Sequence, residues 1–250
     1  WIVIPAVTPS NFAAVTQLAH CYPTCAYALG IHPLYVADAD ESDLQALRTA
    51  LEAAHDDSRL VAIGEIGLDL FVPAYKEAPL RQKQEYFFTQ QLKLAREFEL
   101  PVLLHVRRSQ DIILKYLRRI PTMGGIAHAF NGSFQQAEMF IQLGFKLGFG
   151  GAMTFSRALQ LRRLATQLPL TSIVLETDAP DLAPAWLHPA RNEPVQVAGI
   201  GQVLAQLREL SPTQVAEQTS VNATVVLPRL AQLIMPLVGS LTMPKSAPPS

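Results

Sequence analysis

Four apolar segments in this sequence each lead into a side chain that can bind a metal ion, and this repetition constrains the fold most strongly. The first segment begins at Val61 and reaches a lone carboxylate, Glu65, which lies between Gly64 and Gly67. An apolar run with β-branched residues is typical of a strand buried on both faces, and we expect this strand to end at Glu65. A buried, unpaired carboxylate is costly, so a divalent cation at the strand end is one explanation. An ordinary acidic turn residue after a core strand is the alternative.

The same pattern recurs in three segments downstream. Segments 100–105 and 125–128 end in His105 and His128, and segment 172–178 ends in Asp178. A single histidine after an apolar run is more often a core or loop residue than a metal ligand. Four such strand ends favour a (β/α) barrel, because the catalytic residues of that fold come from the C-terminal ends of several strands. Carboxylates together with imidazoles form a suitable ligand set for a hydrolytic divalent metal.

The composition is compatible with one domain built on a covered parallel sheet. Of the 250 residues, 49% are hydrophobic and 16% are charged, a balance that a sheet covered on both faces accounts for. The formal net charge of -1 provides no long-range basic field, so a nucleic-acid substrate would be bound by local contacts. No apolar run reaches the roughly 18 residues of a membrane span. Cys21 and Cys25 are too few for a disulfide framework, and we expect a cytoplasmic protein.

Strand and helix patterns alternate along most of the chain. The expected strands are 1–7, 26–31, 61–65, 100–105, 125–128, 145–150 and 172–178, and the expected helices are 10–20 with Ser10 as N-cap, 42–54, 77–99, 110–119, 134–143, 156–168 and 193–210, with another beginning at Ser211. A doubly wound sheet also alternates, but the chain lacks the Gly-rich phosphate turn typical of that fold. We predict an α/β fold, a TIM-type (β/α)8 barrel that lacks its first strand before Trp1. The barrel domain spans 1–227, and 228–250 form a C-terminal tail that we expect to be poorly ordered beyond Leu241.

Five ordered motifs resemble those of one protein family. The motifs are Gly30-Ile31-His32-Pro33, Gly64-Glu65-Ile66-Gly67-Leu68-Asp69, Leu104-His105, His128-Ala129-Phe130-Asn131-Gly132-Ser133 and Glu176-Thr177-Asp178-Ala179-Pro180. In order and spacing they resemble the TatD family of metal-dependent deoxyribonucleases and related hydrolases, in the amidohydrolase superfamily, and within it the YjjV-like branch. The resemblance covers residues 1–227 and implies hydrolysis of phosphodiester bonds, with DNA as the expected substrate.

The resemblance also implies the cofactor and the site residues. Two divalent ions, Mg²⁺, Mn²⁺ or Zn²⁺, would be bound by Glu65, His105, His128 and Asp178. Glu65 would bridge the ions, and His105 with His128 would complete one site. Asp178 would lie near the other ion and orient or deprotonate the attacking water, so Glu65 and Asp178 are the expected catalytic residues. The Asp-x-His-x-His strand of the family is absent here, which implies one nearly complete metal site and one weakened site.

Further residues are expected to contact the substrate. His32 would line the mouth of the site, Arg107 and Arg108 would bind phosphate, and Asn131 would add a hydrogen bond. We expect a monomer.

Two alternative functions stay open at this point, because a barrel fold does not decide its substrate. One is a metal-dependent amidohydrolase acting on a small molecule, and the other is an inactive fragment that binds metal or a partner without turnover.

Overall fold

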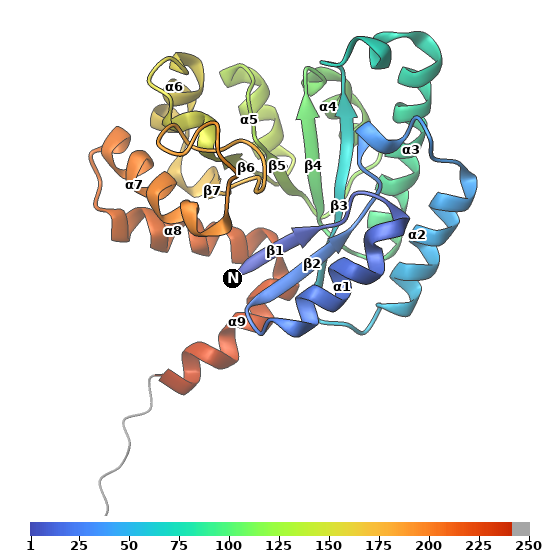
Figure 1. Ribbon diagram of the computed structural model, residues 1–250, viewed down its shortest axis with the longest axis horizontal. Coiled ribbons are helices and arrows are strands. Elements are labelled where there is room, and N and C mark those ends of the chain that lie inside the picture. Colours follow the sequence, from blue (N-terminus) through green and yellow to red (C-terminus); the bar gives the residue numbers. More distant parts are fainter. Residues whose placement is uncertain (242–250) are drawn as a thin grey trace, which may run out of the picture.

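The computed structural model describes residues 1–241, with side chains through residue 234. Strands and helices alternate in it along the chain (Figure 1). The strands are β1 (Ile2–Pro5), β2 (Cys25–Leu29), β3 (Leu60–Asp69), β4 (Val102–Arg107), β5 (Gly125–His128), β6 (Phe145–Phe149) and β7 (Ile173–Leu175). The helices are α1 (Phe12–Cys21), α2 (Glu41–Ala53), α3 (Ala78–Glu97), α4 (Gln110–Arg119), α5 (Phe134–Gln142), α6 (Leu159–Gln167), α7 (Val197–Arg208), α8 (Pro212–Val226) and α9 (Pro228–Leu241). Within these described residues, none of the helices combines the length and apolar character that crossing a membrane requires.

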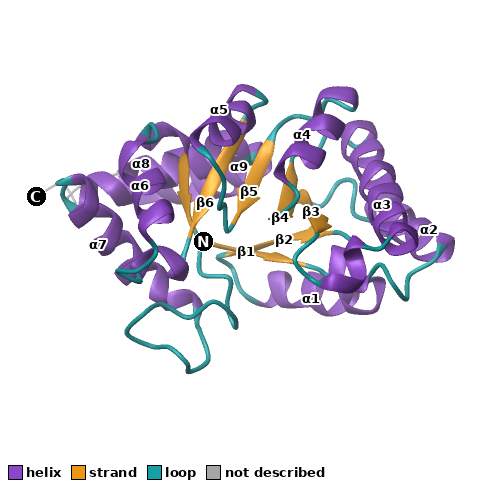
Figure 2. Cartoon of the chain, turned by 90° about the horizontal axis from the view of Figure 1, so that it is seen from above, coloured by secondary structure: helices purple, strands orange, loops and turns teal. Residues whose placement is uncertain are grey.

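All strands belong to one parallel sheet whose spatial order, β1 to β7, follows the chain. Seen from above, the strands form an arc with helices along its outer side (Figure 2). Among the described residues no pairing joins β7 back to β1, so the sheet is open there. The predicted α/β class and its seven barrel-type strands are confirmed. Because every strand is parallel to its neighbours, all C-terminal strand ends lie along the same edge of the sheet.

The strand β3 differs from the prediction in a way that matters for the site. It does not end at Glu65 but continues to Asp69, and each of its ten residues is buried. Its pairing with β4 shifts in register between Ile63 and Ile66, the segment that contains Glu65. Beyond the shift, the backbone of Gly67 approaches the carbonyl of His105 so closely that a Cβ would clash. The strand therefore continues because glycine permits this contact, and Glu65 lies inside the sheet rather than in a turn.

The core has two parts, one on each face of the sheet. The larger part lies between the sheet and the outer helices and includes Tyr27, Leu29 and Ile63. The smaller part lies on the opposite face, where Val61 and Leu103 of the sheet pack with residues from α8 and α9.

The predicted helix start at Ser10 is wrong: this residue lies in a short 3-10 turn, Pro9–Asn11, and α1 begins only at Phe12.

Helix α9 extends the described structure past the predicted domain boundary at residue 227. Its Leu230 is buried against the inner face, and the guanidinium of Arg229 donates hydrogen bonds to the carbonyls of His55 and Leu60, at 3.2 and 3.3 Å. The segment that follows residue 227 thus begins as a packed helix, because it supplies apolar side chains to the sheet. Residues 242–250, where we expected poor order, lie outside the described residues.

Candidate metal centre

One carboxylate oxygen, Oε1 of Glu65, lies at the centre of the predicted site. The Nε2 atom of His128 is 2.7 Å from it, the Nδ1 atom of His105 is 2.8 Å away, and the Nε2 atom of His32 is 3.3 Å away. Glu65 comes from β3, His105 from β4 and His128 from the end of β5, and His32 follows β2. His105 and His128 are direct register partners in the sheet. Parallel pairing therefore brings together side chains that lie far apart in the sequence.

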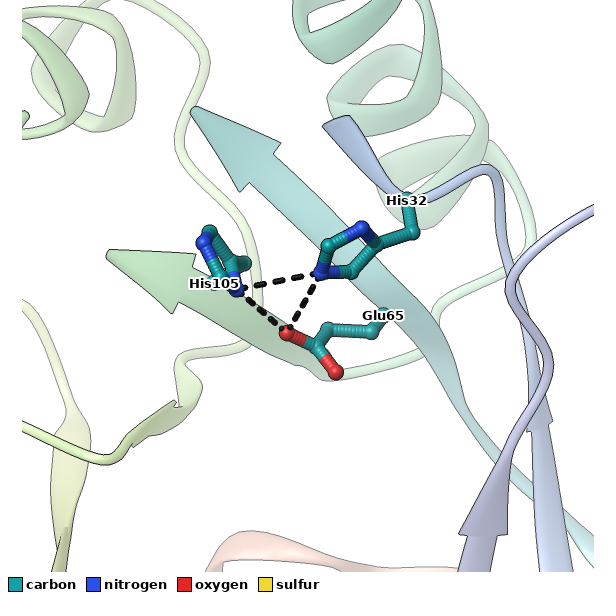
Figure 3. A group of neighbouring side chains, drawn as sticks. All are labelled: His32, Glu65 and His105. Atoms are coloured by element: carbon teal, nitrogen blue, oxygen red, sulfur yellow. Dashed lines mark hydrogen bonds and ion pairs between the residues drawn. The ribbon is translucent and has the colours of Figure 1, made fainter. Parts of the chain in front are cut away.

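Three of these side chains converge as a group with metal-ligand geometry (Figure 3). One ligand atom from each of His32, Glu65 and His105 lies within 4.8 Å of the others. Imidazole nitrogens with a carboxylate oxygen suit a divalent ion such as Zn²⁺ or Mn²⁺, so the residues fit the metal that the sequence predicted. His32 was predicted as a substrate contact at the mouth of the site. Its Nε2 atom lies 3.1 Å from Nδ1 of His105, which is a position for a metal ligand.

Asp178 lies at the other side of His128. The Nδ1 atom of His128 is 3.8 Å from Oδ1 of Asp178 and 3.6 Å from Oε1 of Glu176. The sequence motif that contains Glu176 predicts no role for it. Its carboxylate accepts a hydrogen bond of 2.6 Å from the backbone N–H of Ala129, which fixes it beside the imidazole. His128 thus lies within 3.8 Å of the carboxylates of Glu65, Glu176 and Asp178.

Opposite charges hold the centre together. Burial would raise the pKa of Glu65, but the charge of His128 and hydrogen bonds from His105, His128 and His32 outweigh it and keep that pKa well below its usual range. Burial would lower the pKa of His128, but the nearby carboxylates of Glu65 and Glu176 outweigh it and raise that pKa well above the usual value. The pKa of His105 is also raised, because hydrogen bonds to Asp69 and Glu65 outweigh its burial. A carboxylate that is ionised while buried among imidazoles is suited to binding a cation.

Asp178 has the opposite electrostatic environment. Burial raises its pKa, the charge of His128 opposes this shift, and the carboxylates of Glu176 and Glu65 add to it. The net direction is upward. Unlike Glu65, Asp178 is therefore a carboxylate whose burial the surrounding side chains do not fully compensate.

Asp69 is a functional candidate that the sequence did not single out. Its side chain is fully buried, and its Oδ2 atom lies 3.1 Å from Nε2 of His105. Its Oδ1 atom accepts a hydrogen bond of 2.8 Å from the backbone N–H of Phe71. A carboxylate behind a ligand histidine fixes the orientation of the ring. Its position in the sequence could have indicated this role. Asp69 ends the motif that contains Glu65, and residues four apart on a strand point to the same face of the sheet.

The residues predicted to contact the substrate lie at the end of β4 and in the loop after β5, beside this centre. Arg107 ends β4, and its guanidinium carbon lies 3.9 Å from the centroid of the Phe71 ring. Its Nη1 atom lies 3.6 Å from Oδ2 of Asp69. Arg108 lies over the same ring at 4.7 Å. Asn131 is exposed in the loop after β5, and its backbone carbonyl accepts a hydrogen bond from Gln110. Arg107 and Asn131 remain predicted substrate contacts.

A barrel-type sheet that gathers imidazoles and carboxylates at its C-terminal strand ends is typical of metal-dependent hydrolases. The family model described as TatD related DNase matches residues 1–228. The chain belongs to the TatD family. It is 41% identical over 228 residues to the uncharacterized metal-dependent hydrolase YjjV of Escherichia coli K12, a match that covers 90% of this chain and 85% of that protein.

Other similar proteins agree with this family. The 3'-5' ssDNA/RNA exonuclease TatD of Yersinia pseudotuberculosis is 34% identical over 232 residues, with 89% of this chain and 85% of that protein covered. The crystal structure of the TatD homologue YjjV from Escherichia coli K12 superimposes with a TM-score of 0.85 at 38% identity, covering 91% of this chain and 86% of that chain. The chain is thus a metal-dependent hydrolase by family.

Proposed function

We propose that this protein hydrolyses phosphodiester bonds of DNA with the help of two divalent metal ions. The observation that carries the proposal is the convergence of three imidazoles on one buried oxygen of Glu65. The family supports the hydrolytic class, and the name of the Yersinia relative supports a nucleic-acid substrate. An ionised carboxylate compensates the charge of bound cations, and neutral imidazoles beside it add ligand atoms that suit divalent metals.

The protein would bind the ions through the residues already described. Glu65 would bridge them, His105 and His128 would complete one site, and Asp178 would bind near the other, with His32 as an additional imidazole beside Glu65. When bound, such ions supply positive charge that activates water and stabilises charge on phosphoryl oxygens. Asp69 would hold His105 in the orientation that directs its Nδ1 atom toward Glu65.

The chain's own groups would handle the proton and the substrate. The carboxylate of Asp178 would orient the attacking water and accept its proton at a carboxylate oxygen. Arg107, stacked on Phe71, would donate hydrogen bonds to a substrate phosphate next to the bond that breaks. Asn131, in the neighbouring loop, would bind a sugar or phosphate oxygen.

Turnover measurements with added metal test the proposal. Purified protein would be assayed with a single-stranded oligodeoxynucleotide and with bis(p-nitrophenyl) phosphate, in Mg²⁺, Mn²⁺ or Zn²⁺ and in a chelator. We expect hydrolysis that requires metal and that is lost in Glu65→Gln. The matched variant Glu97→Gln, at an exposed carboxylate paired with Arg48, controls for the loss of a carboxylate elsewhere and should stay active, and equal activity in Glu65→Gln would reveal a contaminating nuclease. Hydrolysis of amides or lactones without any phosphodiester turnover would contradict the proposal and favour the amidohydrolase alternative.

A further inference from the structure

A cavity of about 530 Å³ lies on the loop that carries Asp178 and is separate from the metal ligands. Its walls come from two connections, the one between β6 and α6 and the long one between β7 and α7. The first supplies Phe155 and Arg157, and the second supplies Asp181, His188 and Arg191. The loop turns from Asp178 into the cavity wall within three residues, because the backbone N–H of Asp181 donates to the carbonyl of Asp178 at 2.8 Å. The cavity is therefore a direct neighbour of the candidate active site.

The chemistry of the walls combines aromatic surface with positive charge. The Phe155 and His188 rings meet edge to face, with centroids 5.7 Å apart, and the guanidinium carbon of Arg157 lies 5.3 Å from the centroid of Phe155. Arg191 is exposed and lies 3.3 Å from Glu193, an ion pair that solvent weakens. Asp181 is the acidic residue in the wall and can accept a hydrogen bond from an exocyclic amine. A flat π-system next to guanidinium groups suits a nucleobase and its phosphate.

Hydrogen bonds hold the walls in place. The side-chain amide of the fully buried Asn192 donates to the carbonyls of Thr177 and Asp181, at 2.5 and 2.8 Å. The backbone N–H of Ala185 donates to the hydroxyl of Thr154 at 2.8 Å, which ties the β7–α7 loop to the β6–α6 connection. In Figure 1 this orange loop lies beside the yellow segment that leads into α6. The cavity is thus pre-formed, and its volume is in the range of ligand sites.

We propose that this cavity is a nucleotide subsite, which binds one unpaired base and its phosphate next to the metal centre. The inference rests on the proposed function and adds the residues that would position the strand. The base stacks on Phe155, and Arg157 with Arg191 binds the phosphate that follows. A base must be unpaired to enter such a cavity, so the subsite selects single-stranded over duplex substrate.

Binding without turnover tests the subsite by itself. Fluorescence anisotropy of a labelled single-stranded oligodeoxynucleotide, in a chelator, would be compared for the wild type, Phe155→Ala and Arg157→Ala. We expect the affinity to fall roughly tenfold in each variant, because one stacked base or one phosphate contact is lost. Phe155→Tyr keeps the ring and should retain the affinity. Arg163→Ala, an exposed arginine on α6 stacked on Phe134, is the matched control and should have no effect.

The outcomes separate the subsite from the proposed function. Unchanged affinity in Phe155→Ala and Arg157→Ala, or an equal loss in Arg163→Ala, would overturn the subsite. Turnover of bis(p-nitrophenyl) phosphate should be the same in wild type and Phe155→Ala. If this turnover falls together with oligonucleotide affinity, Phe155 maintains the structure of the metal centre, and the subsite proposal is overturned. If the wild type hydrolyses no phosphodiester but its binding still depends on Phe155, the proposed function fails while the subsite stands.

Discussion

Asp69 lies directly behind His105, with its Oδ2 atom 3.1 Å from the Nε2 atom of the imidazole. The opposite nitrogen of the same ring, Nδ1, lies 2.8 Å from Glu65. A histidine held in this way presents one nitrogen to the site in a fixed tautomer and orientation. The orientation of His105 in the candidate metal centre therefore depends on Asp69.

The first prediction concerns this supporting carboxylate. We expect Asp69→Asn to weaken divalent-metal affinity by about 10- to 100-fold, because His105 loses the charge that orients and polarises it. Isothermal titration with Mn²⁺ or Zn²⁺ measures the change. Asp111→Asn, an exposed carboxylate that accepts from Gln136 at 2.8 Å, is the control and should bind as the wild type does. Equal affinity in the Asp69 variant would remove its orienting role.

The second prediction concerns the carboxylate at the centre. Glu65→Gln keeps the shape of the side chain but removes the charge that three imidazoles surround. We expect metal content and phosphodiester turnover to be lost together while the circular dichroism spectrum stays unchanged. Elemental analysis after dialysis gives the metal content. Full metal content with lost turnover would show that Glu65 acts in the chemistry without binding the ions.

The third prediction concerns Arg107, whose guanidinium is stacked on Phe71. We expect Arg107→Ala to raise KM for an oligonucleotide roughly tenfold with little change in kcat. The slope of log affinity against log salt concentration should decrease by about one, because one phosphate contact is lost. Arg118→Ala, on the outer helix α4, is the matched control. A large fall in kcat would instead show that Arg107 acts on His105 through Asp69.

The fourth prediction concerns the buried Asn192, which holds the two ends of the β7–α7 loop. Asn192→Ala leaves the carbonyls of Thr177 and Asp181 without this partner, so we expect the free energy of unfolding to fall by about 1–3 kcal/mol. Urea denaturation measures the loss, and hydrogen exchange should increase in residues 177–192. Asn131→Ala removes an exposed side chain and should leave stability unchanged. A stable Asn192 variant with normal exchange would mean that the loop is held by other contacts.

The fifth prediction concerns pH. Asp57 accepts hydrogen bonds from the hydroxyl of Tyr27 at 2.7 Å and from the backbone N–H of Arg59 at 2.9 Å. Burial raises the pKa of Asp57, but these hydrogen bonds and the contact with His20 outweigh it, and the net shift is downward. A folded-state pKa below the unfolded value of about 3.9 stabilises the protein above that pH, and the contribution is lost as pH falls through the folded pKa.

Comparison of Asp57→Asn with the wild type tests this relation. At pH 7 we expect the variant to be less stable by about 1–2 kcal/mol, because its neutral amide accepts the same hydrogen bonds more weakly. The difference should shrink as the pH falls below about 4. Asp56→Asn, at the exposed neighbouring position, is the control. A difference that stays constant down to pH 3 would show that the effect does not arise from the charge of Asp57.

The sequence determined the order and type of the elements, because the signals for these are local. Apolar segments predicted the seven strands, and the expected helix starts at residues 134 and 211 agree with α5 and α8, where Ser133 and Ser211 form capping boxes. The four metal-competent strand ends predicted one functional edge of a parallel sheet. The side chains of Glu65, His105 and His128 do meet there.

Only the tertiary structure decided which atoms meet at that edge. A register shift places Glu65 within β3 rather than at its end, the fold brings His32 from the loop after β2 to Glu65, and Asp69 lies behind His105. Hydrophobic periodicity describes which face of an element is buried, but not how far one strand is shifted against the next. The positions of these side chains depend on strand register and on sheet curvature. Both arise from contacts between residues distant in the sequence, so they exist only once the sheet has formed.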